Sequence, residues 1–252
     1  MMDFPVTFHI FGKDILLHPI TETIGIFVGM RYYTFSKRND KEKFSNVNSL
    51  LILIAATLGA LIGSHLIGSL ERPDDLIKAS DTWMYIWLNN TIVGGLAGGL
   101  IGVEIMKKII GKKESTGDRM VYPLIVAMFI GRIGCFCTGI YEETYGLPTS
   151  SMLGMDLGDH INRHPVALYE MIFLLILFIS LKYFQRNYAY KSGVLFQIFM
   201  LFYFSFRFLL DFIKPTYNII LGLSTIQLVC ISIIIYYIYL LKKNRHEIIR
   251  SR

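Results

Sequence analysis

Lysine and arginine recur in four clusters, and each cluster stands at the same end of successive apolar segments. The clusters comprise Lys37, Arg38, Lys41 and Lys43; Lys107, Lys108, Lys112, Lys113 and Arg119; Lys182, Arg186 and Lys191; and Lys242, Lys243, Arg245, Arg250 and Arg252. Basic residues that flank apolar segments on one side are typical of loops that stay in the cytoplasm. This pattern predicts a multi-pass protein of the bacterial plasma (inner) membrane.

The composition excludes an ordinary soluble domain. Of the 252 residues, 53% are hydrophobic and only 17% are charged, which is typical of a polytopic helical membrane protein. The formal net charge of +6 does not indicate nucleic-acid binding, because most basic residues lie in the clusters rather than on one amphipathic face. We expect an all-α fold with a single transmembrane domain over residues 1–252 and no nucleic-acid partner.

Seven apolar runs separate the polar connections, and each is close to the length of about 20 residues that crosses the hydrocarbon core. The runs cover residues 20–36, 49–70, 91–109, 121–138, 167–184, 194–213 and 221–241. With every basic cluster inside, an odd number of spans predicts an outside N-terminus and a cytoplasmic C-terminus. Trp83, Tyr85 and Trp87 precede the third run, where an amphipathic stretch is expected to lie in the headgroup layer.

Arg132 lies in the fourth apolar run, toward the end opposite the basic clusters. An arginine inside a span costs about 2.5–3.5 kcal/mol unless it faces water or a partner, so Arg132 requires a counter-charge or an anionic ligand. Gly131 and Gly134 flank it, and their small size is expected to leave room for a ligand. The structural alternative is an ion pair with Glu170 or Asp211 that only joins helices.

The sixth run repeats this arrangement with Arg207, Asp211 and Lys214. Arg207 and Asp211 are four residues apart and share a helical face, so one interpretation is that they neutralise each other. Lys214 follows at the outer boundary. Two arginines and a lysine near one boundary suit a phosphate, because a guanidinium offers a planar fork of donors that matches phosphate oxygens. A carboxylate would be a less demanding ligand.

Two histidines are candidates for acid–base roles at the outer end. His164 precedes the fifth run, where it either acts as an acid or base or caps the helix. Glu170 lies deeper and is expected to orient an arginine. His18 and Glu22 are four residues apart on one face of the first helix and are expected to face the same outer layer.

Glycines mark two further segments. In the third run, Gly98 and Gly99 belong to a series of small residues that lets a neighbouring helix approach closely; the alternative is a backbone surface for a lipid chain or headgroup. The connection 139–165, which contains Gly146, exceeds the roughly 12–15 residues beyond which an unstructured loop is usually functional. We interpret it as a lid or acceptor-binding arm, with a loop of no role as the alternative.

The three cysteines predict neither a disulfide framework nor a metal site. Cys135 and Cys137 would lie about 200° apart around a helix, and Cys230 is near the middle of the last run. A Cys-x-Cys pair alone is weak evidence for metal.

One set of motifs resembles a known family. The segment 131–136, Gly-Arg-Ile-Gly-Cys-Phe, runs on to Tyr-Gly-Leu-Pro-Thr at 145–149, and Arg-His-Pro at 163–165 precedes Leu-Tyr-Glu at 168–170. Together with the third-run glycines, Asp118, and Arg207 with Asp211, these segments are similar to a divergent branch of the prolipoprotein diacylglyceryl transferase family. The resemblance covers most of the chain.

This resemblance implies a seven-span enzyme of the outer leaflet. Such an enzyme moves the diacylglyceryl group of phosphatidylglycerol onto the lipobox cysteine thiol of a prolipoprotein signal peptide and releases glycerol phosphate. Arg132 and Arg207 would hold the lipid phosphate and stabilise the departing group, while Glu170 and Asp211 would orient them. No metal or organic cofactor is expected.

Two positions depart from the family pattern. Ala97 stands where a histidine is usual before the paired glycines, and Cys135 stands where an asparagine is usual. The proton of the acceptor thiol must then go elsewhere, and His164 and His18 are the available bases. Two alternatives stay open: a non-catalytic lipid-binding or transport protein of the same fold, and a related transferase with a different acceptor.

Overall fold

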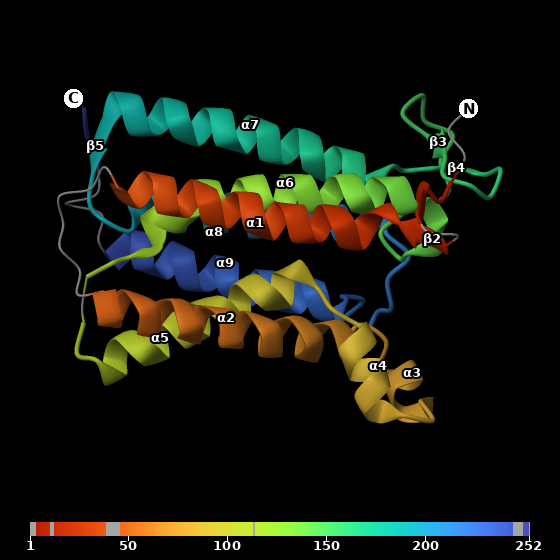
Figure 1. The fold of residues 1–252 in the computed structure, drawn as a ribbon, viewed down its shortest axis with the longest axis horizontal. Helices are drawn as coiled ribbons and strands as arrows, with labels where there is room; N and C mark the ends of the chain where they lie inside the picture. Colours follow the sequence, from red (N-terminus) through yellow and green to blue (C-terminus); the bar gives the residue numbers. More distant parts are fainter. Residues whose placement is uncertain (1–3, 11–12, 39–45, 113, 244–248, 252) are drawn as a thin grey trace.

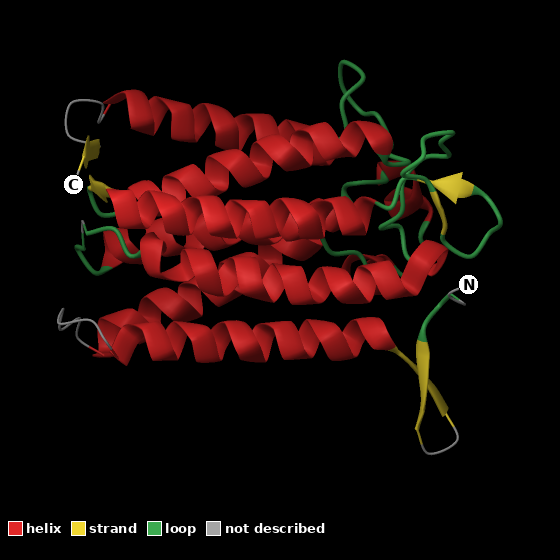
Figure 2. Cartoon of the chain, turned by 90° about the horizontal axis from the view of Figure 1, so that it is seen from above, coloured by secondary structure: helices red, strands yellow, loops and turns green. Residues whose placement is uncertain are grey.

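The computed structural model describes residues 4–10, 13–38, 46–112, 114–243 and 249–251, and these residues are mostly helical. Long helices run side by side as a bundle, with loops and short strands at its two ends (Figure 2). This arrangement confirms the predicted helical fold class. Five members of the basic clusters lie outside the described residues: Lys41, Lys43, Lys113, Arg245 and Arg252.

Seven long helices in the described residues match the seven predicted apolar runs. They are α1 (Leu17–Arg38), α2 (Asn46–Ser69), α5 (Ile92–Ile109), α6 (Val121–Thr138), α7 (Val166–Asn187), α8 (Val194–Leu210) and α9 (Thr225–Lys243). Two short helices, α3 (Pro73–Lys78) and α4 (Thr82–Leu88), join α2 to α5. Short 3-10 turns, η1 (Gly117–Met120), η2 (Gly139–Tyr141) and η3 (Asp211–Ile213), precede α6, follow α6 and follow α8.

Five of these helices, α2, α6, α7, α8 and α9, are long and apolar enough to cross a membrane. The pair of α4 and α5, bent by 93°, makes a sixth if it counts as one span. Glu104, Lys107 and Lys108 shorten the apolar part of α5. The first helix, which carries Glu22 and Arg31, is the least apolar of the seven. By length and composition the described chain therefore has five or six crossing helices, and a crossing by α1 stays a prediction.

Short strands and basic helix ends divide the bundle into two different ends. The hairpin of β1 (Thr7–Ile10) and β2 (Lys13–Leu16) lies at the same end as β3 (Met155–Asp156) and β4 (Asn162–Arg163), whereas β5 (Tyr188–Tyr190) lies at the opposite end (Figure 1). There β5 pairs with β6 (Ile249–Ser251). The basic C-terminal ends of α1, α5, α7 and α9 also point to the β5 end. Which end faces the cytoplasm stays a prediction.

The core lies between α6, α7, α8 and α9. Leu174, Phe199, Tyr203 and Tyr237 are at most 2% exposed and belong to one apolar cluster. Large apolar side chains also cover the outside of the bundle, among them Phe27, Ile62, Ile179, Leu209 and Ile235. Helices that are apolar on their outer faces as well as in the core are typical of a bundle surrounded by lipid.

Small residues bring α2 and α5 into backbone contact. A Cβ atom on Gly98 would lie 2.2 Å from Gly59 O, and one on Gly94 would lie 2.3 Å from Gly63 O. Gly99 lies to the side, where a Cβ would make only ordinary contacts with α2 at 3.4 Å or more. The predicted packing role is confirmed. Gly98 is used in this packing contact, whereas Gly99 is only partly buried, so the alternative of a lipid-binding surface there stays a prediction.

Replacing Gly98 by alanine is expected to lower the unfolding temperature in detergent, whereas Gly99→Ala leaves it unchanged or raises it. The Cβ at position 98 collides with the Gly59 carbonyl, and overpacking of this kind costs about 1–3 kcal/mol. Alanine favours the helix over glycine at both positions, so the difference between the variants isolates the contact with α2. Circular dichroism measures both transitions, and equal unfolding temperatures would contradict the prediction.

The long connection 139–165 is ordered against one end of the bundle. The Leu147 N–H donates to the Ile213 carbonyl at 2.8 Å, and the Gly146 N–H donates to the His164 carbonyl at 3.0 Å. The β3–β4 hairpin lies within it. These bonds hold the connection beside the ends of α6, α7 and α8, where the polar residues of the spans gather.

Candidate active site

Glu170 of α7 joins two arginines from neighbouring helices. Its Oε2 atom lies 2.9 Å from Arg132 Nε of α6 and 3.0 Å from Arg207 Nη1 of α8. Its Oε1 atom accepts a hydrogen bond of 2.8 Å from the Tyr203 hydroxyl. The structure thus brings three of the expected site residues into contact and adds Tyr203, which sequence reasoning did not single out.

The cluster of Arg132, Glu170 and Arg207 is buried and carries more positive than negative charge. The side chains of Glu170, Arg207 and Arg132 are 1%, 4% and 14% exposed. Burying charges is costly unless they are paired, and a single carboxylate neutralises only one of the two guanidinium groups. Arg207 Nε is buried without a partner among the described residues. The cluster therefore suits an anionic ligand, and phosphate oxygens match guanidinium donors.

Asp211 makes a different contact from the one expected. Its Oδ2 atom accepts a hydrogen bond from the Ser224 hydroxyl, just before α9, and its Oδ1 atom is buried without a partner among the described residues. Arg207 makes its ion pair with Glu170 instead. The interpretation that Arg207 and Asp211 simply neutralise each other is therefore wrong, because the guanidinium turns toward α7.

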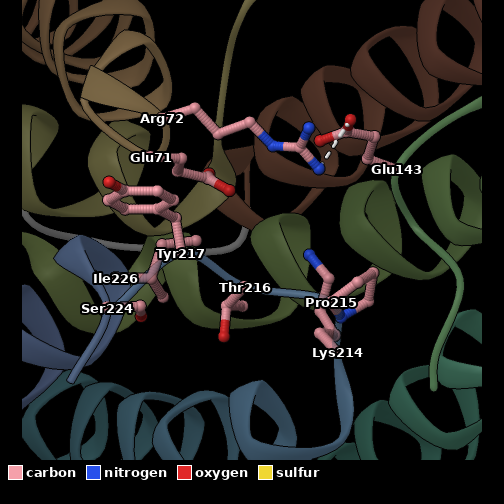
Figure 3. A pocket seen from close by; sticks show the side chains of 9 residues that line it. All are labelled: Glu71, Arg72, Glu143, Lys214, Pro215, Thr216, Tyr217, Ser224 and Ile226. Carbon is pink, nitrogen blue, oxygen red and sulfur yellow. Dashed lines mark ion pairs between the residues drawn. The ribbon is translucent and has the colours of Figure 1, made fainter. Parts of the chain in front are cut away.

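A pocket lies beside this cluster, between the α2–α3 connection and the segment after η3 (Figure 3). It is lined by Glu71, Arg72, Glu143, Lys214, Pro215, Thr216, Tyr217, Ser224 and Ile226. Ser224 connects the pocket lining to the buried carboxylate of Asp211, because its hydroxyl donates to Asp211. The pocket therefore lies one hydrogen bond from Asp211, which follows Arg207 by four residues.

Some charged groups in this pocket form ion pairs and others do not. Arg72 Nη2 lies 2.8 Å from Glu143 Oε1, whereas Lys214 makes no ion pair with a described residue. Burial, followed by the charge of Arg207, lowers the pKa of Lys214, and burial raises the pKa of Glu71. Sequence reasoning missed Arg72 and Glu71; their signal was the charged connection that directly follows the second apolar run.

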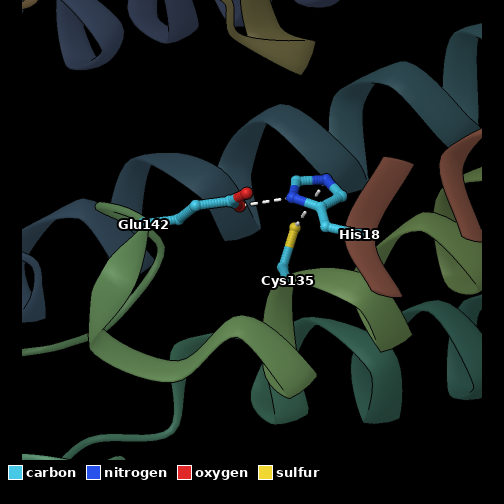
Figure 4. Close-up of side chains that lie close together, drawn as sticks. All are labelled: His18, Cys135 and Glu142. Atoms are coloured by element: carbon cyan, nitrogen blue, oxygen red, sulfur yellow. Dashed lines mark hydrogen bonds and ion pairs between the residues drawn. The ribbon is translucent and has the colours of Figure 1, made fainter. Parts of the chain in front are cut away.

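His18, Cys135 and Glu142 form a second polar cluster that touches the first (Figure 4). His18 Nδ1 is bonded to the Glu142 carboxylate, and His18 Nε2 lies 3.8 Å from Cys135 Sγ. Arg132 Nη1 donates to the same sulfur at 3.3 Å. A chain of contacts therefore runs from Glu142 through His18 and Cys135 to Arg132.

Gly134 explains how α1 reaches this cluster. A Cβ at Gly134 would lie 2.0 Å from Thr21 Oγ1 and 2.8 Å from His18 Cα, so α1 occupies the space beside it. A Cβ at Gly131 would meet no atom within 4 Å. The expectation that both glycines leave room for a ligand is therefore wrong for Gly134, whose missing side chain admits α1.

The remaining site candidates lie farther from the arginines. His164 Nδ1 is 3.1 Å from the Tyr169 hydroxyl, and its side chain does not cap α7. Gly146 contacts His164, because a Cβ on Gly146 would lie 2.6 Å from His164 Cβ. Glu22 is exposed, and the structure gives it no contact with either polar cluster. Ala97 is buried in α5 and offers no proton acceptor.

Three potential metal ligands come together in the described residues: His18, Cys135 and Glu142, whose ligand atoms lie within 4.8 Å of one another. The histidine, however, uses Nδ1 toward Glu142 and Nε2 toward Cys135. These two contacts connect the three groups in series, from Glu142 through His18 to Cys135, as proton transfer would require.

Comparison with known proteins covers nearly the whole chain. A family model described as prolipoprotein diacylglyceryl transferase matches residues 5–242. Three similar proteins are named phosphatidylglycerol–prolipoprotein diacylglyceryl transferase. The protein from Finegoldia magna is 30% identical over 258 residues, with 98% of both chains covered. Those from Clostridium tetani and Campylobacter hominis are 26% and 27% identical, with 96% of this chain and 98% and 93% of theirs covered.

Proposed function

The chain belongs to the prolipoprotein diacylglyceryl transferase family, and we propose that it performs this reaction where Arg132, Glu170 and Arg207 meet. It is a membrane transferase of lipoprotein biosynthesis that moves the diacylglyceryl group of phosphatidylglycerol to a prolipoprotein. The observation that carries the assignment of the site is the Glu170 carboxylate, which pairs with two buried guanidinium groups. Arg207 Nε still has no hydrogen-bond partner among the described residues and is available to a ligand.

The lipid phosphate binds to the two arginines, with its headgroup toward the pocket that contains Lys214. The unpartnered Nε of Arg207 and the ammonium of Lys214 supply the donors. Guanidinium groups in a buried site interact strongly with phosphate oxygens. The apolar outer faces of the bundle leave room for the two acyl chains in the surrounding lipid.

In the transfer step, the lipobox cysteine sulfur of the acceptor attacks the glyceryl carbon that is bonded to the phosphate oxygen. A carbon–sulfur bond forms and the carbon–oxygen bond breaks. The electron pair leaves with glycerol phosphate, whose charge is stabilised by Arg132 and Arg207. Stabilisation of charge that develops in the transition state is usually the largest catalytic effect.

His164 is the base that takes the proton of the acceptor thiol. Its Nδ1 atom is held by Tyr169, and no described residue binds its Nε2 atom. Both nitrogens of His18 are already occupied by Glu142 and Cys135. The connection 139–165 carries His164 on its last turn and serves as the arm under which the acceptor peptide enters.

The active end faces the outer leaflet of the plasma membrane. The arginine cluster lies near the ends of α6 and α8 and the beginning of α7, away from the basic C-terminal ends of α1, α5, α7 and α9. Basic loops stay in the cytoplasm. The acceptor therefore meets the lipid on the side where secreted precursors emerge.

The direct test incubates the purified protein with phosphatidylglycerol and a peptide that contains a lipobox cysteine. Mass spectrometry is expected to find diacylglyceryl joined to the peptide cysteine through a thioether. An active relative such as the Finegoldia magna protein serves as the positive control. Binding of phosphatidylglycerol without product, while the control reacts, would show a lipid-binding protein and contradict the proposal.

Replacing His164 by glutamine is expected to lower the transfer rate by about 10²–10⁴-fold, the usual contribution of a positioned base. His160→Gln is the matched control, because His160 lies in the same connection with a side chain that is 93% exposed. It should transfer at the normal rate. Normal transfer by His164→Gln would exclude His164 as the base.

A further inference from the structure

We propose that Cys135, His18 and Glu142 form a nucleophilic triad, in which the Cys135 sulfur accepts an acyl group from a carboxylic ester of a membrane glycerolipid. This activity is separate from diacylglyceryl transfer, in which the acceptor sulfur belongs to another protein. It rests on the proposed function in one respect, because the same arginines hold the lipid.

The contacts of the triad are those of a thiol with a base and an orienting group. His18 Nε2 faces Cys135 Sγ at 3.8 Å, and Glu142 binds the opposite nitrogen of the ring. Glu142 therefore fixes the ring orientation and stabilises the imidazolium that forms when Nε2 takes the thiol proton. A nucleophile, a base and a third group that orients the base are the usual parts of such a site.

Arg132 supplies a positive charge next to the same sulfur. Its Nη1 atom lies 3.3 Å from Cys135 Sγ, and a nearby guanidinium favours a thiolate over a thiol. The same group lies where an oxyanion would form if the sulfur attacked a carbonyl carbon. The buried sulfur is thus placed between an imidazole and a guanidinium, an environment that a structural cysteine does not need.

Apolar space adjoins Cys135. A pocket is lined by Cys135 itself and by neighbours that include Phe136, Tyr145, Leu157 and Val166. These neighbours come from α6, the connection 139–165 and the start of α7. An acyl group next to the sulfur would be covered by carbon surface, whereas the polar groups of the triad approach the sulfur from α1 and Arg132.

The position of the arginines selects the substrate class. A phospholipid whose phosphate is bound by Arg132 and Arg207 has its two ester groups only a few covalent bonds from that phosphate. Arg132 touches both Glu170 and Cys135, so the sulfur lies beside the same lipid. The carbons of this lipid that a thiolate near Arg132 would attack are therefore the ester carbonyl carbons.

Acylation of Cys135 requires no reactant other than the lipid ester. The Cys135 thiolate attacks the ester carbonyl carbon, a carbon–sulfur bond forms, and the ester carbon–oxygen bond breaks. The departing lysophospholipid oxygen takes the proton that His18 received from the thiol. An acyl thioester remains on Cys135, and water or another nucleophile then removes the acyl group and restores the thiol.

The test incubates the full-length protein in detergent with phosphatidylglycerol of one defined acyl length and no acceptor peptide. Intact-mass spectrometry is expected to show one added acyl group on Cys135, and neutral hydroxylamine should remove it. In parallel, p-nitrophenyl butyrate should give a burst of nitrophenolate close to one per protein. Cys137→Ser, which alters the neighbouring cysteine, should keep both signals, and Cys135→Ser should lose them.

His18→Asn and Glu142→Gln should slow alkylation of Cys135 by iodoacetamide at least about 10-fold, since they remove the base and the group that orients it. Absence of both burst and adduct, with Cys135 alkylated no faster than Cys137, would overturn the proposal. A hydroxylamine-resistant adduct with the mass of diacylglyceryl would overturn it as well. Transfer to a lipobox peptide without acylation would refute only the triad, and acylation without transfer would refute only the proposed function.

Discussion

Arg207→Ala is expected to lower kcat/KM for diacylglyceryl transfer by at least about 10²–10³-fold, the loss that follows removal of one donor to a developing anion. The protein should still insert and fold, because Glu170 keeps Arg132 and the Tyr203 hydroxyl as partners. Arg132→Ala is expected to have a similar effect on transfer. The measurement is product formation on a lipobox peptide, at equal amounts of protein extracted from the membrane.

Two further variants separate charge from geometry. Arg207→Lys keeps the charge but offers no planar fork of donors, so its rate should lie between those of the wild-type protein and Arg207→Ala. Arg31→Ala is the control, since Arg31 is an exposed arginine of α1 and its loss should leave the rate unchanged. Normal transfer by both Arg132→Ala and Arg207→Ala would end the assignment of this site.

Glu170→Gln is expected to be the most destabilising single change in the cluster. The isosteric amide leaves two buried guanidinium groups without a counter-charge, and breaking a buried ion pair typically costs about 3–5 kcal/mol. The unfolding temperature in detergent should fall well below that of the wild-type protein. Glu104→Gln makes the same chemical change at a carboxylate that is 51% exposed and paired with Lys107, and it should have little effect. Equal unfolding temperatures for the two variants would show that Glu170 does not balance the arginines.

The sequence predicted what depends on local pattern. Apolar runs and basic clusters indicated the long helices and their common basic end, because the cost of burying charge in lipid restricts where Lys and Arg can stand. Arg132 and Arg207 were found for the same reason. Small residues in the third run predicted close packing of α5, and the structure identified α2 as its partner.

What the sequence could not predict depends on contacts between distant segments. Cys135 and His18 are 117 residues apart, and only the approach of α1 at Gly134 brings them together. The same approach reversed the expected role of Gly134. The sequence indicated Glu170 as a partner of one arginine. The apolar periodicity of α6 and α8 could not indicate that arginines from both helices contact the same Glu170 oxygen. Arg72 was missed because it lies in a connection that becomes part of the pocket only when α3 and α4 fold back.

The right-angled turn between α4 and α5 directs α4 across the axis of α5, where α4 contacts the pocket wall. Trp83 and Trp87 of α4 are 82% and 63% exposed, and the Tyr85 hydroxyl donates to the Arg72 carbonyl at the pocket wall, at 3.4 Å. Tryptophans favour the level of the lipid headgroups, so we expect this short helix to hold the pocket at the depth of the lipid phosphates. In bilayers of different thickness, we then expect tilting to be taken up toward the far end of the bundle, with a constant distance between the pocket and the phosphate layer.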